Sequence, residues 1–215
     1  MRYPIFRIHK TRLAVLSLVL LVACSNKGDI PTTQSTTSQS DSIPACGLQC
    51  ANAELRGIFI RVGDSTSYLR ADFRFAHLSG ATLRGVFEGA DFSTANLSGA
   101  DLSTATFKDS SFDGADLTGT NFASTFLART SLSNARLIDA NLSGSQIWHS
   151  SFFWANLEGA NLEGANLDCS SFDNSNLRGA MFKGAKISFS TFEEVIGETP
   201  PNDHVRTIND CQEAP

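Results

Sequence analysis

Hydrophobic positions recur at every fifth place over more than half of the chain. From residue 71, a small residue (Ala, Ser, Thr or Gly) opens each group of five, and Leu, Phe or Ile takes the third place. One residue is missing after the first three units. From Gly85 the pattern then runs unbroken to Phe192, which gives 22 units, or 25 with the first three. No helix or strand has a period of five, so the pattern predicts a solenoid of short repeats.

A longer period of four units lies on top of the short one. Sorting the large positions by every fourth unit gives one series that is almost entirely Phe and a neighbouring series that is entirely Leu. Coils of four units, stacking like side chains on like, would produce this pattern, and the repeat region would then form about six coils. The two series are Phe92, Phe112, Leu132, Phe152, Phe172 and Phe192, and Leu97, Leu117, Leu137, Leu157 and Leu177.

The units resemble those of the pentapeptide-repeat family, whose consensus is Ala-Asp/Asn-Leu followed by any two residues. Ala100-Asp101-Leu102, Ala115-Asp116-Leu117 and Ala160-Asn161-Leu162 match it fully. The resemblance implies an all-β fold, a right-handed quadrilateral β-helix with the large and small positions pointing inward. We expect the β-helix at 71–192. Because the ends of such a rod need caps, we expect an N-terminal cap or degenerate first coil at 46–70 and a C-terminal cap or tail at 193–215.

The start of the chain, up to Cys24, has the layout of an export signal. Residues 2–12 are basic, Leu13–Val22 is apolar, and Ala23 precedes Cys24. Residues 1–23 therefore predict a signal peptide, whose apolar run is too short for a membrane-spanning helix. An ordinary cleaved signal with an incidental cysteine is the alternative to the lipid anchor described next.

Leu21-Val22-Ala23-Cys24 resembles the lipobox of bacterial lipoproteins. The resemblance implies cleavage between Ala23 and Cys24 and attachment of fatty acyl chains such as palmitate to Cys24, which would hold the protein on a membrane of the cell envelope. By resemblance to Gram-negative lipoproteins, Ser25 in place of Asp favours the outer membrane, facing the periplasm. Without an outer membrane, the site would be the outer face of the plasma membrane. Residues 24–45 are rich in Ser and Thr and predict a disordered tether.

Four cysteines remain after Cys24. An even number in an exported protein favours disulfides, and of the three connectivities we favour Cys46–Cys50 and Cys169–Cys211. Cys46-x-x-x-Cys50 lacks a second pair with zinc spacing, so we expect no metal. His149 precedes Cys169 by one expected coil and thus lies beside it on the rod. A convex rod offers no oxyanion donors or cleft to such a pair, so we expect neither catalytic residues nor a cofactor.

Both tryptophans fall close together in the sequence. Trp148, Phe153 and Trp154 take outward positions in consecutive units, with His149 between them and Phe126 one coil earlier. Exposed aromatic clusters mark contact sites, so these five residues are the candidate interaction patch. Cover by the C-terminal tail is the competing interpretation, and a homodimer contact stays open.

Charge decides between the functions that this fold can serve. The net charge is −5, from 17 Lys and Arg against 22 Asp and Glu, and loss of the basic N-terminal segment would make the chain more acidic still. An acidic chain of this kind is ill suited to binding nucleic acid. Some pentapeptide-repeat proteins of the quinolone-resistance type mimic DNA and bind a topoisomerase, but Glu158, Glu163, Asp168 and Asp173 would spiral around the rod. We therefore expect a non-enzymatic, membrane-anchored scaffold that binds an envelope protein or a glycan, ahead of a DNA mimic or an envelope hydrolase.

Overall fold

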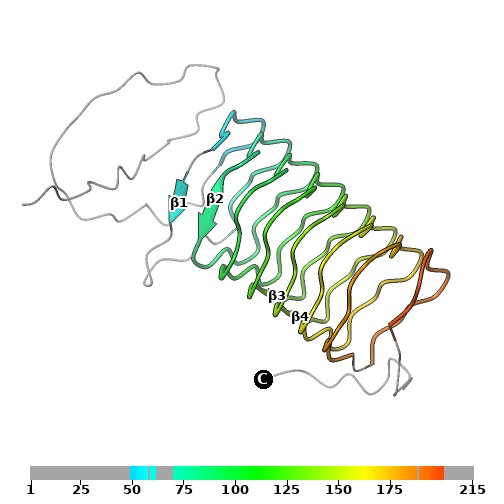
Figure 1. Ribbon diagram of the computed structural model, residues 1–215. Helices are drawn as coiled ribbons and strands as arrows, with labels where there is room; N and C mark the ends of the chain where they lie inside the picture. The colour runs from blue at the N-terminus through cyan, green and yellow to red at the C-terminus, as the bar shows by residue number, and fades with distance from the viewer. Residues whose placement is uncertain (1–48, 58, 62–69, 188, 201–215) are drawn as a thin grey trace, which may run out of the picture.

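The protein is a rod of stacked coils, with β1 at one end and residues near 200 at the other (Figure 1). The computed structural model describes residues 49–57, 59–61, 70–187 and 189–200. The predicted signal peptide (1–23) and the predicted tether (24–45) lie outside these ranges. So do three of the cysteines: Cys24, Cys46 and Cys211. Within them, no helix is long and apolar enough to cross a membrane.

Parallel bridges between successive coils set the length of the repeat. Ser111 pairs with Ser131, Asp116 with Arg136 and Asn121 with Asn141, each at an interval of 20 and one on each side of the coil. Four such bridges follow one another before the series returns to its first side, so each coil has four sides. On two of the sides a bridge lengthens into a pair of short strands. β1 (Phe59–Arg61) pairs with β2 (Thr82–Arg84) on the side that holds Asn121. β3 (Phe126–Ala128) pairs with β4 (Gln146–Trp148) on the fourth side.

The missing residue shortens one coil. Asp72 pairs with Asp91 and Thr82 with Asp101, both at an interval of 19, whereas Val86 pairs with Thr106 at 20. The deletion therefore falls at the corner around Gly85, whose φ of 108° differs from that of every other corner in the repeats. Next to this corner, Arg84 donates hydrogen bonds to the backbone and carboxylate of Asp101 on the following coil.

The inward side chains stack as the four-unit period predicts. The rings of Phe92 and Phe112 lie 4.8 Å apart and 4° from parallel, and those of Phe152 and Phe172 lie 4.6 Å apart at 5°. The large positions from residue 73 to 177 are fully buried, and each contributes roughly 1.5–3 kcal/mol to stability. Phe182 and Phe192 in the last coil are only partly buried, because within the described residues no further coil packs on their outer side.

Each corner is a tight turn with a positive φ at one fixed position. Except at Gly85, the second residue after each large position has φ between about 50° and 70°, and glycine occupies 11 of these sites. The Asp or Asn of the consensus supports the same turn, since its side chain accepts a hydrogen bond from the backbone N–H two residues later, as Asp116 does from Thr118. The consensus polar residue is thus a turn-forming group, which explains its recurrence without any binding role.

The side that carries β3 and β4 has a different corner, which we call the open corner. Elsewhere an N–H closes the turn, as when Ala95 donates to Phe92 O at 3.0 Å. At the open corner a hydroxyl of the next coil replaces this bond. Ser150 Oγ accepts from Thr130 N at 3.2 Å and donates to Leu127 O at 2.6 Å. The small residue of this corner is accordingly Ser or Thr in every coil after that of Ala90: Ser110, Thr130, Ser150, Ser170 and Ser190.

The rod begins earlier than the regular repeat. Gln49 pairs with Asp72, Glu54 with His77, and β1 with β2, all at intervals of 23. Cys50, Leu55 and Ile60 lie buried where these pairings place the large positions. Because the interval to the next coil is 23 residues, this coil is out of phase with the five-residue repeat that begins at residue 71.

Parallel pairing also continues past Phe192. Ile196 pairs with Asn176, and the next residue, Gly197, stands where a large side chain is due. A Cβ on Gly197 would lie 2.7 Å from Arg178 N, so the chain has drawn close against the preceding coil. The large position is lost here because the backbone itself fills the space.

Candidate functional site

The candidate patch divides into two aromatic pairs. Phe126 and Trp148, which we call the packed pair, come from β3 and β4. Their ring centroids lie 5.0 Å apart at 76°. Trp148 lies in register with Ala128, which is 6% exposed. The indole Nε1 of Trp148 is buried and has no hydrogen-bond partner in the described part of the chain. Both rings are partly buried and mainly pack against the side of the rod.

Phe153 and Trp154 form the next corner along the chain, and we call them the aromatic turn. Phe153 is 42% exposed and Trp154 is 58% exposed. Their centroids lie 6.0 Å apart with the rings at 90°, an edge-to-face contact. The Trp154 backbone has a φ of 59° and its N–H donates to Asp173 O at 3.2 Å. The two exposed rings are therefore mounted on a hydrogen-bonded turn.

The fifth patch residue, His149, lies on the open corner between the two pairs. Its side chain is partly buried, and its N–H donates to Asp168 O at 3.1 Å. Among the described residues, ring contacts join Phe126 to Trp148 and Phe153 to Trp154, with none between the pairs. The structure thus brings together two pairs on neighbouring corners instead of one cluster.

The open corner also carries the predicted row of outward residues, one from each coil. Arg129 clamps Asp109 from the next coil, with Nε to Oδ1 at 2.6 Å and an amino group to Oδ2 at 2.8 Å. This contact lowers the pKa of the Asp109 carboxyl. Cys169 is disulfide-bonded, as is Cys50. Because Cys46 and Cys211 lie outside the described residues, the pairings Cys46–Cys50 and Cys169–Cys211 stay predictions. A disulfide sulfur provides no thiolate, so the row holds no Cys–His nucleophile.

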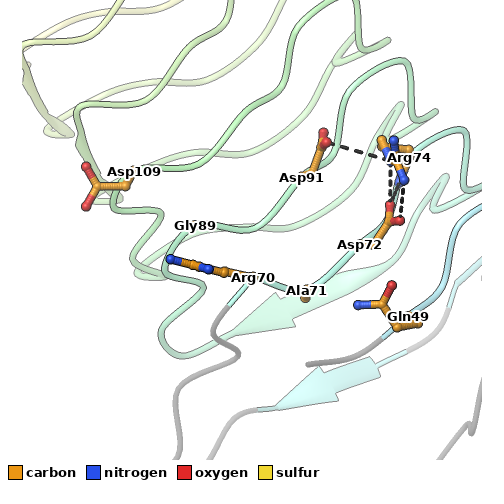
Figure 2. A pocket seen from close by; sticks show the side chains of 8 residues that line it. All are labelled: Gln49, Arg70, Ala71, Asp72, Arg74, Gly89, Asp91 and Asp109. Atoms are coloured by element: carbon orange, nitrogen blue, oxygen red, sulfur yellow. Dashed lines mark hydrogen bonds and ion pairs between the residues drawn. The ribbon is translucent and has the colours of Figure 1, made fainter. Parts of the chain in front are cut away.

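A hollow of about 550 Å³ near the N-terminal end of the rod is a site that the sequence did not point to (Figure 2). Arg74 lies between two carboxylates, with bonds of 2.9 and 2.7 Å to Asp72 and a contact of 3.7 Å to Asp91. The hydrogen bond from Arg74 lowers the pKa of Asp72. Arg70 extends the other way, across Gly89. The full lining is Gln49, Arg70, Ala71, Asp72, Arg74, Gly89, Asp91 and Asp109.

The hollow has little capacity for chemistry of its own. Arginine clamps engage Asp72 and Asp109, and Arg74 also lies near Asp91. In the described part of the chain, no three His, Cys, Asp or Glu side chains are grouped so that they could hold a metal ion. The charged lining instead ties the first coils together, since each pair there that joins two coils opposes their separation. The alternation Arg70, Asp72, Arg74 is the only sequence signal that could have indicated it.

The four-sided rod of stacked five-residue units defines the class of protein: a repeat solenoid that presents side surfaces. Two protein-family models match the sequence. One is described as a pentapeptide repeat region and matches residues 86–162, and the other is described as pentapeptide repeats (8 copies) and matches residues 150–193. A pentapeptide repeat protein from the Arabidopsis thaliana thylakoid lumen is 30% identical over 54% of this chain and 68% of its own, with a TM-score of 0.36. The chain belongs to the pentapeptide-repeat family, whose fold is the predicted right-handed quadrilateral β-helix.

Two further solved structures are more distant. HetL, involved in heterocyst differentiation regulation in the cyanobacterium Nostoc sp., is 21% identical over 71% of this chain and 90% of its own, with a TM-score of 0.24. The plasmid-mediated fluoroquinolone resistance protein QnrB1 is 18% identical over 63% of this chain and 78% of its own, with a TM-score of 0.31. No curated protein matches the chain. Proteins of this family are in general structural or interaction proteins and not enzymes.

Proposed function

We propose that this protein is a non-enzymatic, lipid-anchored component of the bacterial cell envelope that binds another envelope component through the aromatic turn. The observation that carries the proposal is the exposure of Phe153 and Trp154 on a hydrogen-bonded corner. Large aromatic side chains that are exposed to solvent but already fixed in position lose little conformational freedom on binding. Such side chains dominate the energetics of many interfaces.

The envelope location rests on the N-terminal sequence. A basic segment, an apolar run and Leu21-Val22-Ala23-Cys24 are the features of a lipoprotein signal. Acylation at Cys24 and a tether to residue 45 would place the rod beside a membrane, as a coil of this length reaches about 25 Å. The outer membrane facing the periplasm is the site that Ser25 favours. The aromatic turn would then face the envelope compartment.

The distribution of carboxylates favours this function over DNA mimicry. The pairing register places Glu158, Glu163, Asp168 and Asp173 on four different sides of the rod. A mimic of the DNA backbone needs rows of carboxylates along one side, spaced like phosphates. An envelope hydrolase would need a cleft with free nucleophile and base, and Cys169 is not a free thiol.

Crosslinking in envelope preparations tests the proposal. Trp154→Asn with Phe153→Ser should abolish crosslinks that the wild type forms. Asn suits the positive φ of residue 154, as Asn134 and Asn174 show one coil away on each side. Phe75→Asn is the matched control, because Phe75 has a φ of 58° on the same corner and is 56% exposed. Crosslinks that survive the double substitution would refute the proposal.

A further inference from the structure

We infer that the aromatic turn is a carbohydrate site, which binds the apolar face of an uncharged sugar ring in a β-linked glycan. The inference rests on the proposed function, because it names the class of envelope component that this same surface takes. Three features support the inference: the fixed indole of Trp154, the amides of Asn134 and Asn174 beside it, and the absence of charged residues at the equivalent positions of the neighbouring coils.

The indole of Trp154 is a fixed, accessible platform. The ring of Phe153 packs against it at 90° with the centroids 6.0 Å apart, and the turn beneath is closed by a hydrogen bond from Ala155 N to Phe152 O at 2.9 Å. An exposed ring held in this way offers its π-face to C–H groups at little cost in side-chain entropy. A pyranose ring presents such a face of C–H groups, with its hydroxyls around the edge.

Two amides flank the indole where those hydroxyls would lie. Asn134 and Asn174 occupy the same corner one coil on either side, so they stand about 5 Å from Trp154 along the rod. Neither side chain has a hydrogen-bond partner within the described ranges. Each amide can both donate to and accept from a hydroxyl.

Their free state contrasts with other outward asparagines of the repeats. Asn141 donates to Asn121 at 3.1 Å and Asn176 donates to Asn156 at 3.0 Å, which forms amide ladders between coils. Glycine supplies the same positive φ at many other corners. The turn alone therefore requires no amide on both sides of Trp154.

The row of equivalent positions that holds Trp154 is uncharged across the width of a ligand. This row reads Thr94, Gly114, Asn134, Trp154 and Asn174, and it meets its first acid only at Glu194, two coils beyond Trp154. The carboxylate next to Asn174, that of Asp173, accepts hydrogen bonds from Ser171, Thr191 and the backbone of Glu193. The row around Trp154 is thus lined by amides and free of charged side chains, and the oxygens of the one neighbouring carboxylate, Asp173, already accept hydrogen bonds within the protein; this suits an uncharged polyhydroxyl ligand.

The exposed aromatic area favours a sugar over a protein. At the exposures of Phe153 and Trp154, about 200 Å² of ring surface is available on the turn. A stable protein interface needs about 800 Å² from each partner. One or two sugar rings match the smaller area.

Titration with cellohexaose and with chitohexaose tests the site. Trp148→Phe leaves Trp154 as the single tryptophan, so stacking should shift its fluorescence to shorter wavelength. In calorimetry, Trp154→Asn should abolish binding of whichever hexasaccharide the wild type binds. Asn134→Gly with Asn174→Gly keeps the turn and removes both amides, and should weaken binding about tenfold or more. Phe75→Asn should leave binding unchanged.

The outcomes separate this inference from the function on which it rests. If neither hexasaccharide binds the wild type, or if binding survives Trp154→Asn, the carbohydrate site is refuted. If crosslinks to an envelope protein or to a second copy of the chain are then still lost with Trp154, the proposed function stands with a different partner. If neither sugar binding nor crosslinking depends on Trp154, both fail.

Discussion

Sixteen residues other than glycine hold a positive φ in the described chain, and the least suited of them are two threonines. Thr94 and Thr104 have φ of 58° and 63°, a region that a β-branched side chain rarely enters. The corner imposes this conformation whatever residue occupies it, because the hydrogen bonds of the neighbouring coils fix the turn. Such sites store strain that a substitution can release.

Thr104→Gly is accordingly expected to stabilise the protein. Relief of the left-handed conformation is worth about 1–2 kcal/mol, and the greater freedom of glycine in the unfolded chain offsets about 0.5–1 kcal/mol of it. Urea denaturation should show a higher midpoint. Thr106→Gly, at a bridge position without positive φ, should lower the midpoint. A lower midpoint for Thr104→Gly would mean that its side chain makes contacts worth more than the strain.

Gly197→Ala should destabilise the C-terminal end. The new Cβ would meet Arg178 N at 2.7 Å and Leu177 C at 2.8 Å, both backbone atoms that cannot turn away. We expect a loss of about 2 kcal/mol or more in the free energy of unfolding. Gly164→Ala, with φ of 67° and no atom within 4 Å, should cost only about 1 kcal/mol. Equal effects of the two substitutions would contradict the close approach at Gly197.

Hydroxyls at the open corner are the element that distinguishes one side of the rod from the other three. Thr120 and Thr125 also donate to the preceding coil, at 2.8 and 3.2 Å. Within the described structure, only at the open corner does such a hydroxyl also accept an N–H, which makes it part of the turn. Ser175 is the counterexample, since its Oγ is buried without a partner among the described residues.

Ser150→Ala and Ser175→Ala form a matched pair that tests this role. Ser150→Ala leaves Leu127 O and Thr130 N without their hydroxyl partner, and the loss of stability should be about 1–3 kcal/mol. Ser175→Ala removes a polar atom that has no partner within the described ranges, so stability should stay equal or rise. Thermal and urea unfolding would measure both. A loss of the same size at both sites would show that packing, not hydrogen bonding, sets the cost.

Arg84 and Asp101 join two coils at the shortened corner. The hydrogen bond from Arg84 lowers the pKa of Asp101 to about 2 from the ordinary 3.8. A lowered folded-state pKa adds stability that is fully present above pH 3.8 and is lost as the pH falls towards 2. Because the Asp101 side chain is 38% exposed, screening reduces this contribution to about 1 kcal/mol at most.

The free energy of unfolding of Asp101→Asn should therefore be lower than that of the wild type near neutral pH. The two values should converge as the pH falls towards 2. Arg84→Gln should show the same convergence, and the double variant should add little to either single one. Urea unfolding at a series of pH values measures these differences. A constant gap across the acidic range would exclude the ion pair as its source.

Much of the architecture follows from the sequence because the repeat is strict. The stacking of Phe92 on Phe112, with the ring geometry of the same series at Phe152 and Phe172, confirms the four-unit coil. The sequence left residues 46–70 open between a cap and a degenerate first coil, because the spacing of 23 to the next coil breaks the period. The place of Gly197 in the pairing could not be predicted, because the backbone of the preceding coil lies there where the pattern would need a large side chain. Sequence placed Trp148 and Trp154 together, but which ring packs and which is exposed depends on the neighbouring coil.

At the scale of the whole molecule, the proposed lipid anchor at Cys24 predicts that the rod is held at a membrane. Cys24→Ser should abolish incorporation of labelled palmitate and release the protein from the membrane fraction, since acyl chains supply the affinity. Ser25→Ala should retain both. In a Gram-negative host, Ser25→Asp should move the protein to the inner membrane. Unchanged membrane association of Cys24→Ser would refute the lipid anchor.

The hydroxyl bonds of the core also give the rod a direction. Ser110, Thr120, Ser150 and Ser170 each donate to a carbonyl in the coil that precedes them in the chain. Each of these hydroxyls therefore meets an acceptor that is already in place as the chain grows from its N-terminal end. If coils are removed from the C-terminal end, each remaining hydroxyl keeps its acceptor. If coils are removed from the N-terminal end, the hydroxyls of the new first coil lose their acceptors. Shortening this protein is thus a different operation at its two ends.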